Sequence, residues 1–189
     1  SGRTEIVKSP GSLVISAYVT SPDITKVVSP DIKKPGLSRL IYIDIGKGKY
    51  RMGGTALAHV YGQLGDESPD LEDPQLLKRT FHLIQKFIAD DLILSGHDRS
   101  DGGLIVTLLE MAFGGNCGLD LNIHCPLPHN PYPLFSILFS EELGLIIEYL
   151  PVNEDKIIAD LKYNFIPYQI IGDTTVDKKI NMSIDGQTV

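Results

Sequence analysis

The stretch SGHDRSDGGLIVTLLEMAFGGNCG, residues 95–118, joins a polar loop directly to the apolar pattern of a helix. Its first part packs four polar side chains and two glycines together: His97, Asp98, Ser100, Asp101, Gly102 and Gly103. The start of a helix suits phosphate, because its first N–H groups lack partners within the helix and the dipole is positive there. Two carboxylates at that point would repel a bare phosphate, whereas Mg²⁺ is commonly held by one or two carboxylates together with phosphate oxygens. These residues therefore predict a metal-bridged contact with a nucleotide or phosphate.

The composition predicts one globular domain with a substantial core. The chain has 189 residues, 42% hydrophobic and 22% charged, which is enough for such a core. Its net charge of −7 argues against a general nucleic-acid-binding protein, which would carry a basic stripe. We expect no membrane span and no signal peptide. Cys117 and Cys125 do not make a disulfide framework, so we expect reduced thiols and a cytoplasmic location.

Strand and helix patterns alternate along the chain. We expect strands at residues 12–20, 39–45, 93–96, 119–123, 143–149, 168–171 and 179–184. We expect helices at residues 23–28, 55–64, 73–92, 134–139 and 154–163, and one from Leu104 to the glycines at 114–115. The apolar segment 143–149 is expected to lie inside a sheet, and 126–133 is expected to be a loop. Because long parallel βαβ regularity is missing, we favour an α+β (α/β layered) fold, a mixed β-sheet with packed helices.

Within the loop after residue 96, helix capping is the alternative to ligand binding. Ser100 or Asp101 could serve as the N-cap, with the glycines forming a turn. A cap needs only one polar residue, whereas several polar side chains meet here at the end of an apolar strand, where ligand sites are frequent. For His97 we favour structural hydrogen bonding over proton transfer.

A second glycine-rich loop, GKGKYRMGG at residues 46–54, is basic. Lys47, Lys49 and Arg51 precede a predicted helix start, where they could contact a phosphate. The segment is neither a P-loop nor G-x-G-x-x-G. A solvated, hairpin-like loop is the alternative interpretation.

Two further groups of residues carry weaker signals. Four residues carry side chains that could bind zinc: Cys117, His124, Cys125 and His129. Their spacing does not match that of a zinc site. We therefore expect Cys117 to lie in the core. Glu141 and Glu142 precede an apolar strand. A surface turn explains them, and a role near a ligand is the alternative.

Four segments, taken together, resemble formylglycinamide ribonucleotide amidotransferase, also called phosphoribosylformylglycinamidine synthase, of the large single-chain type. They are PGSLVIS at residues 10–16, GGTALAHVYGQLGD at 53–66, GHDRSDGGLIVTLLEMAFGGNCGLD at 96–120 and LFSEELG at 138–144. Smaller relatives of the same architecture are aminoimidazole ribonucleotide synthetase, selenophosphate synthetase and thiamine phosphate kinase. The second and third segments favour the large amidotransferase.

The resemblance implies the function of a longer enzyme. This family amidates formylglycinamide ribonucleotide to formylglycinamidine ribonucleotide in purine synthesis, using ATP, magnesium and ammonia drawn from glutamine. The chain looks like the second C-terminal domain of the aminoimidazole ribonucleotide synthetase-like part, residues 21–189, with residues 1–20 as the end of the preceding sheet domain. Its partners would be the other synthetase domains and the glutaminase domain. No catalytic residue of the family lies in this segment, so the isolated chain is expected to be inactive.

Site residues are carried over by motif. The resemblance implies Asp98 as a magnesium ligand and Ser100 as a contact of ATP or ADP, at a site regarded in the family as auxiliary and structural. Asp101, Gly102 and Gly103 would shape the loop. Two alternatives are a non-catalytic scaffold that docks the other domains, and a smaller relative such as a phosphotransferase.

Overall fold

A seven-stranded mixed sheet forms the centre of the computed structural model, which describes residues 14–21, 23–126 and 133–189. Its strands are β1 (Arg39–Asp44), β2 (Ile93–Asp98), β3 (Gly118–Ile123), β4 (Gly144–Tyr149), β5 (Tyr168–Thr175), β6 (Ile180–Ile184) and β7 (Gln187–Thr188). Their order is β2-β4-β1-β5-β3-β6-β7. The pair β3–β6 is parallel and the other neighbours are antiparallel. The predicted α+β fold with a mixed sheet is confirmed.

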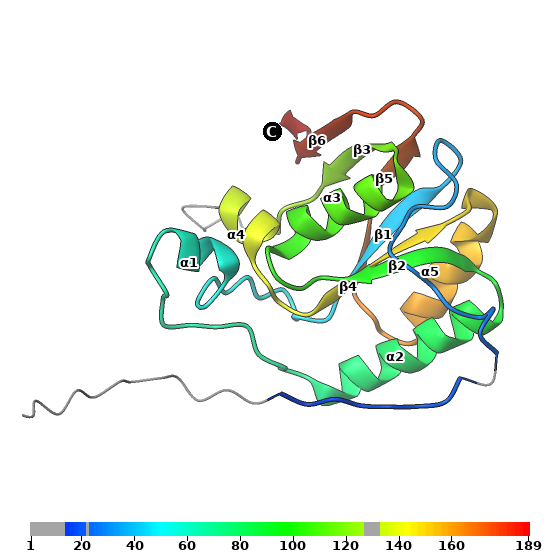
Figure 1. The fold of residues 1–189 in the computed structure, drawn as a ribbon, viewed down its shortest axis with the longest axis horizontal. Helices are drawn as coiled ribbons and strands as arrows, with labels where there is room; N and C mark the ends of the chain where they lie inside the picture. The colour runs from blue at the N-terminus through cyan, green and yellow to red at the C-terminus, as the bar shows by residue number, and fades with distance from the viewer. Residues whose placement is uncertain (1–13, 22, 127–132) are drawn as a thin grey trace, which may run out of the picture.

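Helices cover both faces of the sheet, which gives three layers (Figure 1). They are α1 (Ala56–Val60), α2 (Pro74–Ala89), α3 (Gly103–Gly115), α4 (Pro133–Phe139) and α5 (Glu154–Tyr163). Side chains of α3 and α4 belong to one core and those of α2 and α5 to a second. None of the helices in the described ranges is long and apolar enough to cross a membrane.

Strand β1 lies between the two cores. Leu40 and Tyr42 pack into the core beneath α3, and Ile41 and Ile43 into the core beneath α2. The alternation in this strand indicated one face more buried than the other, but all four side chains are buried because helices cover both faces. Strand β4 pairs with β1 and β2, so its predicted place inside the sheet is confirmed.

Helix α2 shows how local sequence sets an element. Asp73 is its N-cap, with Oδ1 accepting hydrogen bonds from the amides of Gln75 (2.9 Å) and Leu76 (3.0 Å). Pro74 takes the first helical position, where its missing N–H costs nothing. The helix ends at Ala89, earlier than the predicted residue 92, and its Phe81 is exposed.

Two expected elements near the N-terminus are wrong. Residues 14–20 form no strand, and residues 12 and 13 lie outside the described part of the chain. Tyr18 and Val19 are 94% and 95% exposed, so this apolar segment has no sheet neighbour to pair with. The helix expected at 23–28 is a turn, in which Asp23 Oδ1 accepts a hydrogen bond from the Thr25 amide (2.9 Å).

Helix α1 is shorter than predicted, and its apolar residues are not buried. It ends at Val60, and Gly62 and Gly65, both with positive φ, continue the chain as a loop. Val60 and Tyr61 are exposed, because no layer of this domain covers that side of the helix. Strand β7 was not predicted, since the Asp185-Gly186 turn leads into only two paired residues.

A buried carboxylate ties the segment after residue 28 to the sheet. Glu148 of β4 is fully buried and accepts hydrogen bonds from the amides of Lys33 and Lys34, both at 2.8 Å. It also accepts bonds from the hydroxyls of Ser38 (2.6 Å) and Ser95 (2.8 Å). Ser95 lies in β2, so these bonds hold the strand that leads into the predicted ligand loop.

Candidate functional site

The loop between β2 and α3 is held at both ends by its neighbours. Asp98 is the last residue of β2, and its carbonyl accepts a hydrogen bond from Thr107 Oγ1 in α3 (3.2 Å). The amide of Arg99 donates to the carbonyl of Gly144 in β4 (2.8 Å). The backbone on either side of the Asp98 side chain is therefore fixed.

The Asp98 carboxylate points outward, and its side chain is 69% exposed. Its Oδ1 lies 3.3 Å from His97 Nδ1, and His97 Nε2 lies 3.1 Å from Glu110 Oε2. His97 thus makes the structural contacts that were favoured for it. His97 and Asp98 line a cavity of about 300 Å³ whose other walls are Val28, Pro30, Ile84, Ile93, Gly96, Leu145, Ile146 and Ile147. The carboxylate stands at an otherwise apolar hollow, without a backbone turn to lock it.

The capping alternative for this loop is wrong. The N-cap of α3 is Gly102, in the left-handed conformation and without a side-chain cap. Ser100 and Asp101 are both exposed. A glycine at the cap position leaves these two polar side chains unused by the helix.

The two glycines are required by close packing. Gly102 and Gly103 have φ of +85° and +75°, which favour glycine. A Cβ at Gly103 would lie 2.7 Å from the Leu138 carbonyl oxygen and the Phe139 carbonyl carbon. The start of α3 therefore rests directly on the backbone at the end of α4.

Glu141 connects this loop to α1. Its Oε1 accepts hydrogen bonds from the amides of Gly102 and Ala56, both at 2.8 Å. Glu142 is fully buried and receives Arg51 Nη2 on Oε2 (2.8 Å) and Arg51 Nε on Oε1. The surface turn expected for these two acids is wrong, because both bind groups that are distant in sequence.

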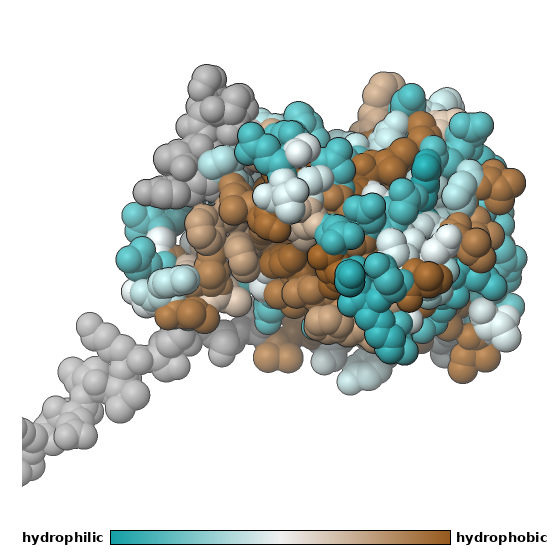
Figure 2. Space-filling view, turned by 90° about the horizontal axis from the view of Figure 1, so that it is seen from above, coloured by the Kyte–Doolittle hydropathy of each residue, from teal (hydrophilic) through white to brown (hydrophobic). Residues whose placement is uncertain are grey.

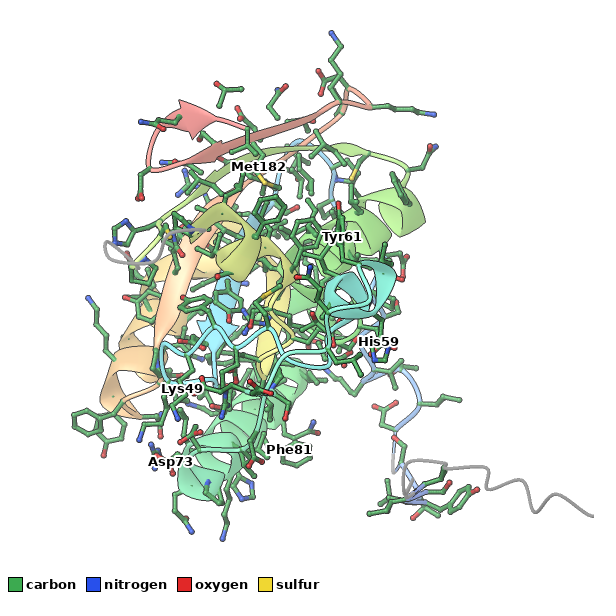
Figure 3. All side chains as sticks on the ribbon, turned by 90° about the vertical axis from the view of Figure 1, so that its left-hand side faces the viewer. Lys49, His59, Tyr61, Asp73, Phe81 and Met182 are labelled. Carbon is green, nitrogen blue, oxygen red and sulfur yellow. The ribbon has the colours of Figure 1, made fainter. Side chains whose placement is uncertain are left out.

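The basic loop at residues 46–54 is paired within the chain. Lys49 Nζ lies 2.7 Å from Glu72 Oε1, and Arg51 Nη1 lies 2.9 Å from the same oxygen. Lys47 Nζ lies 3.8 Å from Asp73 Oδ2, and Figure 3 shows Lys49 and Asp73 on the same side of the molecule. The pKa of Glu72 lies below its usual value, mainly because Glu72 accepts a hydrogen bond from Lys49. This pairing does not support a phosphate cradle, and the exposed residues 47–49 agree with the alternative of a solvated loop.

Arg99 is a buried cation that the motif alone did not reveal. It is 4% exposed, its Nε donates to the Glu142 carbonyl, and its guanidinium lies 5.3 Å from the Tyr42 ring centroid. Its Nη1 and Nη2 have no hydrogen-bond partner among the described residues. Burial raises the pKa of Tyr50 to about 12, and Arg99 lowers it in part. Arg99 thus anchors the loop on the segment before β4.

The three described members of the cysteine and histidine group, Cys117, His124 and Cys125, do not form a metal site. His124 Nδ1 contacts Asp185 Oδ1 at 2.6 Å, and Cys117 lies in the core as predicted. Burial raises the pKa of the Cys117 thiol. Among the described residues no group of three His, Cys, Asp or Glu side chains could hold a metal ion. His129, the fourth residue considered, lies outside them.

The Asp98 carboxylate fits magnesium in one particular way. Mg²⁺ keeps several waters and takes only one or two carboxylates when phosphate oxygens complete its octahedron. Asp98 is an exposed hard-oxygen donor, and Asp101 supplies a second exposed carboxylate in the same loop. Ligands beyond these must come from a nucleotide, from water or from another domain, so the loop is at most half of a site.

A family model described as AIR synthase related protein, C-terminal domain, matches residues 40–185. A probable phosphoribosylformylglycinamidine synthase of Arabidopsis thaliana, labelled chloroplastic/mitochondrial, is 50% identical over 185 residues, 97% of this chain and 13% of that protein. The human phosphoribosylformylglycinamidine synthase is 51% identical over 146 residues, 77% of this chain and 11% of that protein. The chain therefore spans about an eighth of the length of these relatives.

Solved structures share the fold at low sequence identity. Thermotoga maritima PurL in complex with FGAR matches with a TM-score of 0.68 and 16% identity, covering 88% of this chain and 28% of that one. The same protein in complex with ATP gives a TM-score of 0.65 and 15% identity, covering 88% and 26%. A thiamine-monophosphate kinase of Stenotrophomonas maltophilia gives 0.56 and 16%, covering 87% and 54%.

Proposed function

Because the chain belongs to the family of AIR synthase related proteins, C-terminal domain, we propose that it is one domain of a phosphoribosylformylglycinamidine synthase. The enzyme would be an ATP-dependent carbon–nitrogen ligase that amidates formylglycinamide ribonucleotide with ammonia from glutamine. Identities of 50% and 51% to two proteins with that name support this proposal. The domain alone would not turn over, because its loop offers at most half of a site.

Within that enzyme, the domain would contribute an auxiliary magnesium–nucleotide site. Asp98 would bind the metal, Ser100 would donate a hydrogen bond to the nucleotide, and Asp101, Gly102 and Gly103 would shape the loop. Bound magnesium would neutralise phosphate charge beside the carboxylates. The observation that carries this role is the exposed Asp98 carboxylate at the apolar cavity.

The partners would be the other synthetase domains and the glutaminase domain. Figure 2 shows hydrophobic side chains gathered on the face seen from above, where Figure 1 places α3 and α4. Phe113 of α3 and Phe135 of α4 are 70% and 47% exposed. Apolar surface of this kind marks interaction sites.

The N-terminal segment would belong to a neighbouring domain. Residues 1–20 would end the preceding sheet domain and residues 21–189 would form the synthetase-like C-terminal domain. The exposed apolar side chains of residues 14–20 support this division, although residues 1–13 lie outside the described part of the chain. We propose a cytoplasmic location, which cell fractionation would test against the organelles named for the plant relative.

Calorimetric titration of magnesium and ADP into the full-length protein tests the site. We expect Asp98→Asn to weaken ADP binding about tenfold or more in the presence of magnesium, since a metal-coordinating charge is lost. Asp120→Asn is the matched control, because it removes another exposed carboxylate, on β3. Ser100→Ala should weaken binding less, by the loss of one hydrogen bond.

Other outcomes distinguish the alternatives. Equal affinities for wild type, Asp98→Asn and Asp120→Asn would contradict the site and favour a scaffold that only docks other domains. Transfer of phosphate to a small acceptor by the isolated chain would contradict the whole proposal and favour a small phosphotransferase.

A further inference from the structure

We propose that Glu141 is a positioning residue for the loop at residues 98–103, and that it couples this loop to helix α1. The inference rests on the proposed function, because it concerns the same magnesium–nucleotide loop. It assigns a role to a side chain that does not itself contact metal or nucleotide.

A single carboxylate oxygen makes both connections. Glu141 Oε1 accepts a hydrogen bond from the amide of Gly102 and one from the amide of Ala56, each at 2.8 Å. These donors stand at the starts of α3 and α1, which are separated by more than forty residues of sequence. A carboxylate is favoured at both places, because the N-terminal end of a helix carries positive potential. The side chain of a distant segment thus binds the amide of Gly102, the N-cap residue of α3, which has no side-chain cap of its own.

The remaining contacts of the loop explain why this one matters. Arg99 is fixed through its amide on Gly144 and its Nε on the Glu142 carbonyl, and Gly103 rests on the end of α4. Ser100 and Asp101 lie between these fixed points, and both are exposed. A hydrogen bond from the Gly103 amide to the Ser100 carbonyl (3.0 Å) closes the turn after the two polar residues. The bond from Gly102 to Glu141 then ties this turn to the segment before β4.

The link to α1 extends the effect outside the loop. Ala56 is the first residue of α1, and Figure 3 shows His59 and Tyr61 of this region on the side of the molecule that faces the viewer. Tyr61 is 70% exposed. None of the residues within α1 is buried, and its N-cap, the buried Thr55, is the side chain that holds its start. A shift of α1 would move the carboxylate that Gly102 binds, so the position of α1 would alter nucleotide affinity.

Three variants of the full-length protein separate the two connections. Glu141→Ala removes both bonds, and Glu141→Gln keeps an acceptor oxygen. Ala56→Pro removes only the N–H that α1 offers, because proline is tolerated at the first helical position. Thr55, which precedes it, has ψ of 159° and suits the residue before a proline. Asp120→Ala is the control for loss of an exposed carboxylate.

Magnesium–ADP affinity by calorimetry and hydrogen exchange by mass spectrometry are the two readouts. We expect Glu141→Ala to weaken ADP binding about tenfold, as loss of an outer-shell partner does, and Glu141→Gln to recover most of it. Ala56→Pro should weaken binding severalfold. Exchange should rise in peptides covering 53–60 and 98–106 for Glu141→Ala, with Asp120→Ala unchanged.

The results can overturn this inference separately from the proposed function. If Asp98→Asn weakens binding while Glu141→Ala binds as wild type does, the positioning role fails and the site stands. If Glu141→Ala weakens binding and Ala56→Pro does not, the coupling to α1 fails. If no variant binds in an Asp98-dependent way, the proposed function fails, and unchanged exchange in Glu141→Ala would then overturn the positioning role as well.

Discussion

Two glycine-rich, charged loops lead into helices in this molecule, and they differ in whether their charged side chains are paired within the chain. In the loop at residues 46–54, Lys49 and Arg51 are paired with acids elsewhere in the chain. In the loop at residues 97–103, the Asp98 carboxylate stays exposed, and among the described residues it forms an ion-pair contact with His97 alone. The difference shows that the charge of a loop says little about binding until the groups that face it are known.

Two adjacent acids, Glu141 and Glu142, explain why the charges of one loop are paired and those of the other are exposed. Glu142 is fully buried, and a buried carboxylate must be paired, so it draws Arg51 into the interior. Glu141 meanwhile satisfies the amide at the start of α3, which leaves Ser100 and Asp101 unoccupied. The segment before β4 therefore helps to pair the charges of the loop at residues 46–54, called the closed loop here, and leaves those of the loop at residues 97–103, the open loop, exposed.

The largest expected effect comes from breaking the closed loop. Arg51→Met should remove about 3–5 kcal/mol of unfolding free energy, because it leaves the buried Glu142 without its main partner. The pKa of Arg51 is raised, chiefly by its hydrogen bond with Glu142, which agrees with a strong pair. Urea unfolding of the 189-residue chain measures the loss.

Two further variants check this interpretation. Lys49→Met removes an exposed pair from the same loop and should cause a much smaller change. The double variant Arg51→Met with Glu142→Leu should recover most of the stability, since replacing a buried pair by apolar groups is often neutral. An Arg51→Met protein as stable as Lys49→Met would show that the two loops do not differ in this way.

Replacing one glycine of each loop by alanine should give the next largest loss of unfolding free energy. Gly103 and Gly48 both have positive φ, +75° and +69°, which costs either alanine about 1 kcal/mol. Only at Gly103 would the new Cβ meet backbone, 2.7 Å from the Leu138 carbonyl oxygen, whereas nothing lies within 4 Å of it at Gly48. Overpacking should add about 1–3 kcal/mol to the loss for Gly103→Ala.

Urea unfolding of the two alanine variants makes the comparison direct. Equal losses for Gly48→Ala and Gly103→Ala would mean that the end of α4 gives way. The contact that holds the open loop would then be weaker than the structure indicates.

A pH titration sharpens the description of the closed loop. The pKa of Glu72 lies below its usual value of 4.5, mainly because of its hydrogen bond with Lys49. A lowered pKa in the folded state gives a contribution to stability that is present above about pH 4.5 and is lost as the pH falls further. Carboxyl carbon NMR should show Glu72 titrating below 4.5 and moving back toward that value in Lys49→Ala. A Glu72 pKa that does not respond to Lys49→Ala would contradict the pairing.

Periodicity and caps predicted most of the fold. Helix α2, which begins at Pro74 within the range predicted for it, and the apolar run of β4 lie where the patterns placed them. The errors gather where apolar residues are exposed, at residues 14–20 and along α1. A pattern shows which residues are apolar, but not whether this domain or another one covers them.

The candidate site was predictable only in its local part. Asp98, Ser100 and the glycines stand out because they cluster in a few positions of sequence. Glu141 binds a residue 39 positions away at Gly102, and Glu142 binds one 91 positions away at Arg51. Such partners are set by the order of strands in the sheet, which spacing alone does not give.

The smallest expected effect is the change in the free energy of unfolding when the open loop loses one of its carboxylates. Asp98→Asn and Asp101→Asn should each change the unfolding free energy by no more than about 0.5 kcal/mol, as substitutions at exposed sites usually do. The Asp98 side chain is 69% exposed, and within the described part of the chain its one ion-pair contact is with His97 Nδ1, at 3.3 Å. Urea unfolding of these variants beside Arg51→Met would show whether the open loop serves a ligand or the fold. A loss above about 1 kcal/mol for Asp98→Asn would exceed that usual range and make Asp98 a structural residue, like the acids that close the other loop.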